Sequence, residues 1–442
     1  MQRRRAIQTR SRERGQTLLL FAVSVVVLIG MAALAIDATT LYVARGETQR
    51  AADATALAGA KAFVDSGVTT ATNSADEPAL QTLAGTMATG YINTALAQNK
   101  VGGVAANLVG APTPVYPAPG NPQITVTLQR TNLPTFFARI FGQTLATVTA
   151  SATAEAYNSS NPGTAGPNSM PPVAPSCVKP WLVPNIDFHH GNQPFVRLDG
   201  SLPNPGVWGG AANGVIGESL GGLTGVMENI FRPVGQGGIG LPASLPPTMT
   251  AVAGYVGYLP AAVSSFSGPC SACAGGSDLE KSVSCCNTAQ AYACGGPGAN
   301  VLVDLATNGI TDIVSGTACL IGASGGGAEL GRDTIDFGNY PPGGGGSIEI
   351  RAGGGPHNGS FVTTSNQIVT MPIISTDRTL LGAGQVTVIG FMQVFVVLID
   401  SGDGGIQGYI LNISGCGTNI NTAATAISGG GVSAVPVRLI HN

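Results

Sequence analysis

The stretch "RGQTLLLFAVSVVVLIGMAALAIDATTLYVARGETQRAADATALAGA" (residues 14–60) joins an apolar run to a polar, alanine-rich continuation. Residues 17–36 contain no charged side chain, and the run ends at Asp37. A hydrocarbon core about 30 Å thick requires roughly 20 apolar residues of helix. We therefore predict a transmembrane helix over this run. Its anchor residues include Thr17, Leu18, Leu28 and Ile36.

A cleavable leader is the alternative interpretation of this run. A signal peptide has an apolar core of about 7 to 15 residues, which is shorter than the run observed here. The small residues of Ala33-Leu34-Ala35 would nevertheless suit a signal peptidase. Length favours a retained anchor.

The charge distribution predicts the orientation of this anchor. Residues 1–14 carry six Arg and one Glu, a net charge of +5, whereas the remaining 14 basic and 22 acidic residues give −8. A basic segment beside an uncharged run predicts a cytoplasmic N-terminus under the positive-inside rule. Nucleic-acid binding is disfavoured, because the acidic remainder has no basic stripe that could follow a phosphate backbone.

The helix is expected to continue past the membrane surface, from about residue 16 to residue 63, where "DSG" (residues 65–67) stops it. Small residues repeat at steps of four and three and so form one helix-packing stripe. The stripe consists of Ala44, Thr48, Ala51, Thr55, Ala58 and Ala62. Two interpretations remain open: the stripe packs on the protein's own domain, or it assembles laterally with other helices in a homo- or hetero-oligomer.

A membrane helix that continues into an amphipathic rod is the plan of pilin-like proteins. The residues that carry a more specific resemblance are Arg14, Gly15, Gln16, Asp37, Leu41, Tyr42, Arg45, Gln49, Ala51, Ala52, Asp53, Ala54, Leu57, Ala58, Gly59 and Ala60. With these residues the chain resembles TadG-like proteins of the Flp (Tad) pilus assembly system. "QITVTLQRTNLPTFFARIFGQTLATVTASATAEA" (residues 123–156) is similar to the strand, short helix and strand that end this module, so the resemblance covers about residues 12–157.

The resemblance implies a bacterial protein anchored in the inner (cytoplasmic) membrane by one helix, with its bulk periplasmic or extracellular. Its implied partners are other Tad and Flp pilus assembly proteins. Prepilin-type processing is not carried over, because related pseudopilins bear a Glu five positions after the cleaved Gly and this chain has Leu20 there. Metal-dependent adhesion is not carried over either, because the Asp-x-Ser-x-Ser motif of a von Willebrand A domain is missing.

The expected fold class is α+β. We predict a basic cytoplasmic tail (1–16), the transmembrane helix (17–36), a TadG-like module (37–157), a linker (158–176) and a β-rich extracytoplasmic domain (177–442). Helical spacing over residues 77–100 and strands at 123–128 and 146–156 make the module a small α+β unit. The β-rich domain contains the strands "SIEIRA", "NQIVTMPIIS", "VTVIGFMQVFVVLI", "IQGYILNIS" and "AVPVRLI", the third too short and too β-branched for a second transmembrane helix.

All eight cysteines follow residue 170, so an exported domain predicts up to four disulfides. The candidates are Cys177, Cys270, Cys273, Cys285, Cys286, Cys294, Cys319 and Cys416. Sequence does not choose among the pairings. A zinc–thiolate site at "CSAC" and the following "CC", or a thioredoxin-like redox motif, are the weaker alternatives.

The segment "DFHHGN" (residues 187–192) places a carboxylate beside two imidazoles, which are the ingredients of a metal site or a general base. No third ligand is identifiable, and adjacent His residues on a strand would point to opposite faces. We therefore predict no catalytic residue, cofactor or metal, and no enzyme. The Gly-rich loops at 322–331 and 341–347 lack the Lys and Ser/Thr of a phosphate-binding loop.

Three functional hypotheses follow. The first is a structural or assembly component of a Flp/Tad-type pilus or related secretion apparatus, with a helical stem that packs with partner helices. The second is a surface or periplasmic adhesin-like binding module that uses the stem only as an anchor. The third, an exported hydrolase or metalloenzyme centred on His189 and His190, has the least support.

Overall fold

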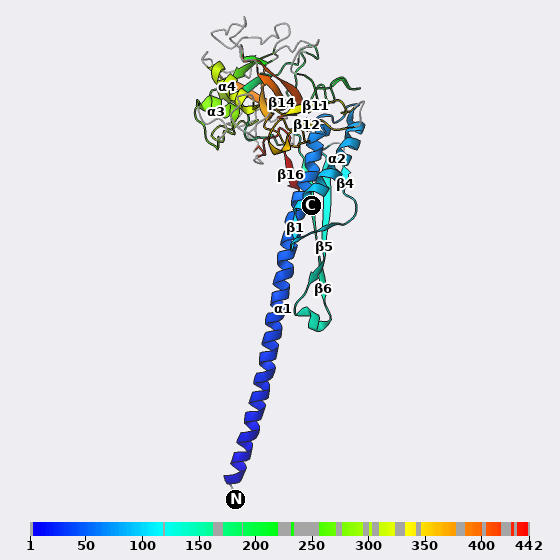
Figure 1. Ribbon diagram of the computed structural model, residues 1–442, viewed down its shortest axis with the longest axis vertical. Helices are drawn as coiled ribbons and strands as arrows, with labels where there is room; N and C mark the ends of the chain where they lie inside the picture. Colours follow the sequence, from blue (N-terminus) through cyan, green and yellow to red (C-terminus); the bar gives the residue numbers. More distant parts are fainter. Residues whose placement is uncertain are drawn as a thin grey trace.

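The computed structural model describes residues 3–117, 120–161, 171–187, 189–219, 231–233, 256–270, 276–294, 300–302, 309–322, 332–341, 346–376, 385–399, 404–416, 426–427 and 431–440. Within these residues the chain forms one very long N-terminal helix, a small module beside the later part of that helix, and a β-rich body at its far end (Figure 1). The fold class is α+β, as predicted.

Helix α1 (Arg3–Asp65) is continuous over 63 residues. At a rise of about 1.5 Å per residue it is therefore about 95 Å long. It begins earlier than expected, because residues 3–14 contain no Gly or Pro and are rich in Arg, a good helix former. The predicted basic tail is thus part of the helix. The helix ends at the expected place, where Gly67 adopts a φ of 75°. A glycine reaches this left-handed conformation at low cost.

The module beside α1 contains a second helix and a five-stranded sheet. After η1 (Val68–Thr70), α2 (Glu77–Gln98) packs on α1. The sheet comprises β3 (Asn107–Leu108), β4 (Thr113–Val115), β5 (Gln123–Pro134), β6 (Leu145–Ala156) and β16 (Val437–Ile440). A short hairpin of β1 (Lys100–Val101) and β2 (Val104–Ala105) precedes it. Alternation in β5 buries Ile124, Val126 and Leu128, and β5 and β6 pair as a long antiparallel hairpin along α1 (Figure 1).

The small-residue stripe of α1 lies inside this module. Ala44, Thr48, Ala51, Thr55 and Ala62 are buried and Ala58 is half-buried. The two threonine hydroxyls are satisfied within the helix, since each donates to the carbonyl oxygen four residues earlier, at 2.7 and 2.6 Å. Of the two interpretations of the stripe, packing on the protein's own domain is the one seen in this chain.

The β-rich body is built around a ring of strands. Its seven-stranded sheet runs in the order β10-β14-β13-β7-β9-β8-β15, and β15 also pairs with β14, so that six strands close on themselves. The strands are β7 (Trp181–Pro184), β8 (Phe231–Pro233), β9 (Val256–Pro260), β10 (Asn300–Leu302), β13 (Ile368–Ile374), β14 (Gln385–Ile399) and β15 (Ile406–Gly415). The apolar run "VTVIGFMQVFVVLI" is therefore a buried strand, as predicted, and β14 and β15 are antiparallel neighbours.

Short elements surround this ring. They are α3 (Asp278–Ser284), α4 (Gly309–Leu320), the two-stranded pair of β11 (Thr334–Asp336) and β12 (Glu349–Arg351), and η5 (Gly355–His357). Helices α3 and α4 pack on each other. The core of the body includes Trp181, Ile373 and Phe391, all fully buried.

The C-terminal strand does not belong to the body to which the sequence assigned it. Strand β16 pairs antiparallel with β6, and so extends the sheet of the N-terminal module. Sequence period alone predicts that "AVPVRLI" is a strand but not which sheet edge it joins, because the pairing partner lies in the first half of the chain. The other domain limits stay a prediction.

Buried polar side chains join the module to the body. Asn158, at the start of the predicted linker, is fully buried and donates from Nδ2 to the carbonyl oxygens of Thr69 (3.0 Å) and Ile413 (2.9 Å). From β15, Asn412 Nδ2 donates to the Val64 carbonyl oxygen at 3.3 Å. Hydrogen bonds between buried groups therefore join the module to the body.

Disulfides hold the Cys-rich region together, as expected of an exported domain. The observed pairs are Cys177–Cys286, Cys270–Cys285 and Cys294–Cys416. Cys319 is also disulfide-bonded, and Cys273 lies outside the described residues. Because these cysteines are bonded in pairs, they do not supply the thiolates of the alternative zinc site. The motif "CSAC" is not a redox pair, because Cys270 is bonded to Cys285.

Candidate functional site

Residues 189–192 of the "DFHHGN" segment form a turn after β7 rather than a strand. Asp187 and Gln193 face each other across an isolated antiparallel bridge. Gly191 and Asn192 turn the chain with φ values of 72° and 64°. Gly and Asn are the residues that tolerate such positive φ values best. The turn, unlike a strand, lets His189 and His190 each reach a carboxylate.

The second carboxylate is Glu218, which sequence analysis did not single out. It lies against β15, where the amide nitrogen of Ile410 donates to the Glu218 carbonyl oxygen at 3.1 Å and Gly217 donates back to the Ile410 carbonyl oxygen at 2.7 Å. No local motif links Glu218 to the earlier turn, and a lone Glu in "IGES" gives no signal. The closed ring of strands brings the two segments together.

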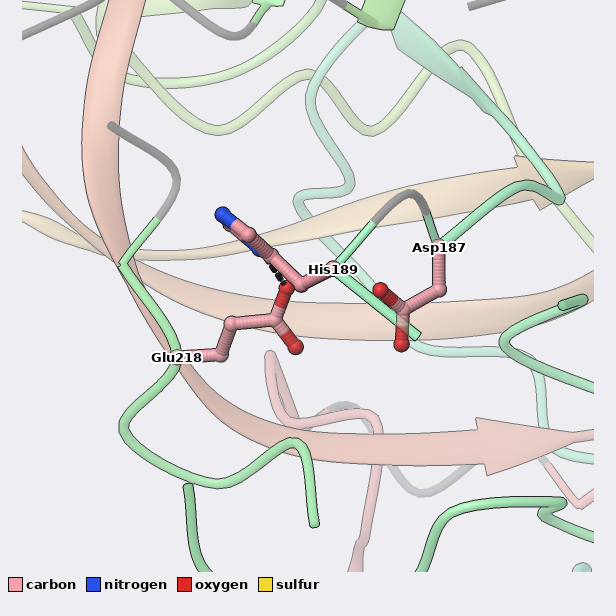
Figure 2. A group of neighbouring side chains, drawn as sticks. All are labelled: Asp187, His189 and Glu218. Atoms are coloured by element: carbon pink, nitrogen blue, oxygen red, sulfur yellow. Dashed lines mark hydrogen bonds and ion pairs between the residues drawn. The ribbon is translucent and has the colours of Figure 1, made fainter. Parts of the chain in front are cut away.

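Two imidazole–carboxylate pairs result, His189 with Glu218 and His190 with Asp187, and Figure 2 shows the first of them. His189 Nδ1 forms a short hydrogen bond with Glu218 Oε1. His190 Nδ1 lies 2.5 Å from Asp187 Oδ2, and its Nε2 lies 2.6 Å from the Asn213 carbonyl oxygen. Since a carbonyl oxygen only accepts, Nε2 of His190 carries a proton.

The cluster is closed to solvent. The side chains of Asp187, Glu218, His189 and His190 are between 0 and 7 % exposed. Trp208 covers the imidazoles, with ring centroids 5.0 Å from His189 and 5.4 Å from His190. This geometry is better suited to binding an ion, or to joining two loops through ion pairs, than to binding a large substrate.

The electrostatics of the cluster follow from burial and proximity. Burial raises the pKa of Glu218 to about 7, although the neighbouring histidines partly oppose this. Burial lowers the pKa of His190, but the charge and hydrogen bond of Asp187 outweigh that effect and raise it above the usual value. Glu218 Oε2 is buried and has no hydrogen-bond partner among the described residues. The cluster therefore holds one carboxylate oxygen that no hydrogen bond compensates.

A second functional feature lies at the other end of the molecule, on the free part of α1. Large apolar side chains from Leu18 to Ile36 are mostly more than half exposed, and the candidate anchor residues Thr17, Leu18, Leu28 and Ile36 all lie on this exposed surface. Among the described residues, one helix is long and apolar enough to cross a membrane, and this is that helix. An exposed apolar surface of this length marks a site of contact with a membrane or with another protein.

The β5–β6 hairpin reaches down α1 to the level at which the apolar run ends (Figure 1). Asp37 is buried, and its carboxylate accepts backbone hydrogen bonds from Phe136 (2.9 Å), Phe137 (2.9 Å) and Ala138 (2.6 Å). These donors open η2 (Ala138–Phe141) at the hairpin tip. One acidic side chain thus fixes the tip to the helix.

The tip itself is apolar and exposed. Phe136 is 62 % exposed and Phe137 36 %, and Leu145 at the start of β6 is 52 % exposed. Arg139 beside them is exposed. Ala33, one helical turn before Asp37, is buried although it belongs to the predicted transmembrane run. The tip therefore lies beside the last turn of that run.

The comparison with known protein families concerns the N-terminal part of the chain, which forms α1. Residues 15–62 match the model of the Tad family, described as Flp pilus-assembly TadE/G-like. The match covers the apolar run and the buried stripe of α1 and stops before α2. No curated protein and no solved structure matches the chain. Residues 15–62, which lie within α1, are thus similar to the TadE/G-like segment of Flp pilus-assembly proteins.

Proposed function

We propose that this protein is a membrane-anchored structural component of a Flp/Tad-type pilus or a related secretion apparatus. The observation that supports this best is that the apolar part of α1 projects from the folded body with its side chains exposed, within the segment that matches the family. The anchor crosses the inner membrane once, with the Arg-rich end inside and the body outside.

The hairpin tip sets the depth of insertion. Asp37 holds residues 136–138 at the end of the apolar run, so Phe136 and Phe137 lie at the level of the lipid headgroups. Aromatic side chains favour this interface, and Arg139 suits the anionic headgroups there. Tyr42, which is 80 % exposed, continues this belt on the helix. The module thus rests on the membrane surface.

Partner helices pack on the membrane-embedded part of α1. The stripe from Ala44 to Ala62 is occupied by the protein's own module and leaves little room for another helix. Among the described residues, nothing covers most of the face between Leu18 and Ile36, and no atom lies within 4 Å of the position of a Cβ added at Gly30. Small residues in a membrane helix permit close approach of another helix.

Site-specific photo-crosslinking in cells tests this assignment. A photoreactive residue at Val26 is expected to yield adducts with other pilus-assembly proteins, whereas the same residue at the buried Ala51 is the matched control and should yield none. Deletion of the gene should abolish pili. Intact pili with lost adhesion would favour a binding module instead.

N-terminal sequencing of the membrane fraction tests the anchor separately. A protein that retains residues 17–36 is expected. A mature chain beginning at Ile36 would exclude the anchor.

A binding role for the body has one observation in its favour. A mostly apolar cavity of about 360 Å³ lies where the end of α1 and α2 meet the body. Its wall includes Lys61, Tyr91, Phe361 and Leu411. A cavity of this size fits a small ligand or peptide side chains, so an adhesin-like module remains the second candidate.

A further inference from the structure

We propose that Asp187, His189 and Glu218 bind a divalent transition-metal ion of the zinc class. Each residue offers one ligand atom, and these atoms lie within 4.8 Å of one another. Figure 2 shows the three side chains converging from the turn after β7 and from the segment beside β15. Zinc binds imidazole nitrogen and carboxylate oxygen at about 2.0–2.2 Å, so small side-chain rotations bring all three atoms onto one ion.

The orphan oxygen of Glu218 points to a ligand. Its side chain is 1 % exposed, and within the part of the chain that the structure describes Oε2 has no hydrogen-bond partner, although Oε1 bonds to His189. The Nδ1 atom of His190 lies 3.9 Å from Oε2, beyond hydrogen-bond distance. A buried carboxylate oxygen without a hydrogen bond costs free energy that a bound cation offsets. The ion would replace the bond between His189 and Glu218 with two coordination bonds.

The donor set selects the kind of cation. Two carboxylates match a divalent charge, and an imidazole favours transition metals over hard cations. Calcium takes six to eight oxygen ligands, more than Asp187 and Glu218 supply together. Zinc needs four ligands, of which three come from the protein and one can be water.

His190 acts as a positioning residue rather than a ligand. Its Nδ1 bonds to Asp187 and its Nε2 to the Asn213 carbonyl oxygen, so the ring ties the ligand carboxylate to a neighbouring loop. Such partners orient metal ligands and typically contribute about 10- to 100-fold to affinity.

The competing explanation is that the same side chains form ion pairs that lock two loops together without a metal. The experiment uses the full chain in detergent, stripped with EDTA, re-equilibrated with Zn²⁺ and desalted. We expect one Zn²⁺ per chain by mass spectrometry and a melting temperature that rises when Zn²⁺ is restored. A stripped protein that takes up no Zn²⁺ and melts unchanged would overturn the proposal and favour the metal-free lock.

Variants locate the ion. Glu218→Gln and His189→Gln should each weaken Zn²⁺ binding by roughly 100-fold or more, and His190→Gln by about 10- to 100-fold. His357→Gln, which alters an exposed histidine, is the matched control and should bind like the wild type. Uptake that persists in Glu218→Gln would place the ion elsewhere and overturn the site.

Trp208 provides a readout that does not require the ligand variants to fold. Its ring lies 5.0 Å from that of His189, and the chain has one other tryptophan, Trp181. Co²⁺ in the stripped wild type should quench the fluorescence, and Trp208→Phe should remove the quenching while Co²⁺ uptake persists. Quenching of equal size in Trp208→Phe would contradict the assignment.

Discussion

At the residue scale, Lys179 shows how burial makes stability depend on pH. Its Nζ donates to the neutral carbonyl oxygen of Cys285 at 2.8 Å, and burial lowers its pKa to about 7. The pKa in the unfolded chain is about 10.4, so between about pH 7 and pH 10 the unfolded chain binds more protons than the folded one. Stability therefore rises with pH across this window, and the gain is lost as pH falls to 7.

The corresponding prediction concerns the slope of this dependence. Lys179→Met should flatten the rise in unfolding free energy between pH 7 and pH 9, by at most about 1.4 kcal/mol per pH unit. Urea unfolding of both proteins at several pH values measures this. The stability of Lys179→Met at a single pH is less informative, because this variant also loses the hydrogen bond to the Cys285 carbonyl oxygen. Identical slopes would show that Lys179 does not titrate in this window.

Asp37 is the second residue with a clear prediction. Asp37→Ala should release the hairpin tip from α1, because three backbone donors lose their shared acceptor. Hydrogen exchange of residues 135–144 is expected to accelerate at least about tenfold, while α2 keeps its protection. Asp53→Ala, which loses a side-chain bond to Gln49, is the control. An unchanged tip would mean that β5 and β6 alone hold it.

At the element scale, two glycines in α1 make opposite predictions. Gly46 has no atom within 4 Å of an added Cβ, whereas at Gly59 that Cβ would lie 3.0 Å from Ile92 Cδ1 and 3.2 Å from Ile124 Cγ2. Gly46→Ala should stabilise the protein by up to about 1 kcal/mol through helix propensity. Gly59→Ala should gain less or lose stability, because Ile92 and Ile124 must shift. Thermal unfolding compares the two, and an equal gain would refute the close packing.

The hairpin tip can be tested with lipid in place. In nanodiscs containing brominated lipid, the added fluorescence of Phe136→Trp should be quenched if the tip occupies the proposed headgroup region. Leu198→Trp is the control, since Leu198 is 52 % exposed on the body. The native tryptophans, Trp181 and Trp208, also lie in the body and set the background. Equal quenching at both introduced positions would contradict the proposed membrane level.

At the scale of the whole molecule, contacts between the module and the body predict that the two parts unfold together. The C-terminal strand β16 lies in the module's sheet, and Asn158 bridges η1 and β15. Calorimetry of the oxidised protein should therefore show one transition for both parts. Asn158→Ala leaves the Thr69 and Ile413 carbonyl oxygens without this donor and should cost about 2–4 kcal/mol. Asn358→Ala, at an exposed position, is the control and should change the free energy of unfolding little. Two separate transitions in the calorimetry of the wild type would refute the coupling of module and body.

Local sequence patterns predicted the elements that depend on neighbours along the chain. The apolar length of residues 17–36, the small-residue stripe, α2, and strands β13 to β15 all follow from run length and from helical or strand periodicity. The stop of α1 follows from "DSG". An even number of cysteines in a domain expected to be exported predicted disulfides, and the resemblance of residues 14–60 agrees with the family model that matches residues 15–62.

Tertiary structure decided what those elements contact. Sequence left open whether the stripe meets its own sheet or another helix, which sheet β16 joins, and which cysteines pair. It also left Glu218 unconnected to the histidines at 189 and 190. The physical reason is shared: period and propensity act over a few residues, whereas these contacts join groups tens to hundreds of residues apart. Only closure of the strands and packing on α1 bring such groups within bonding distance.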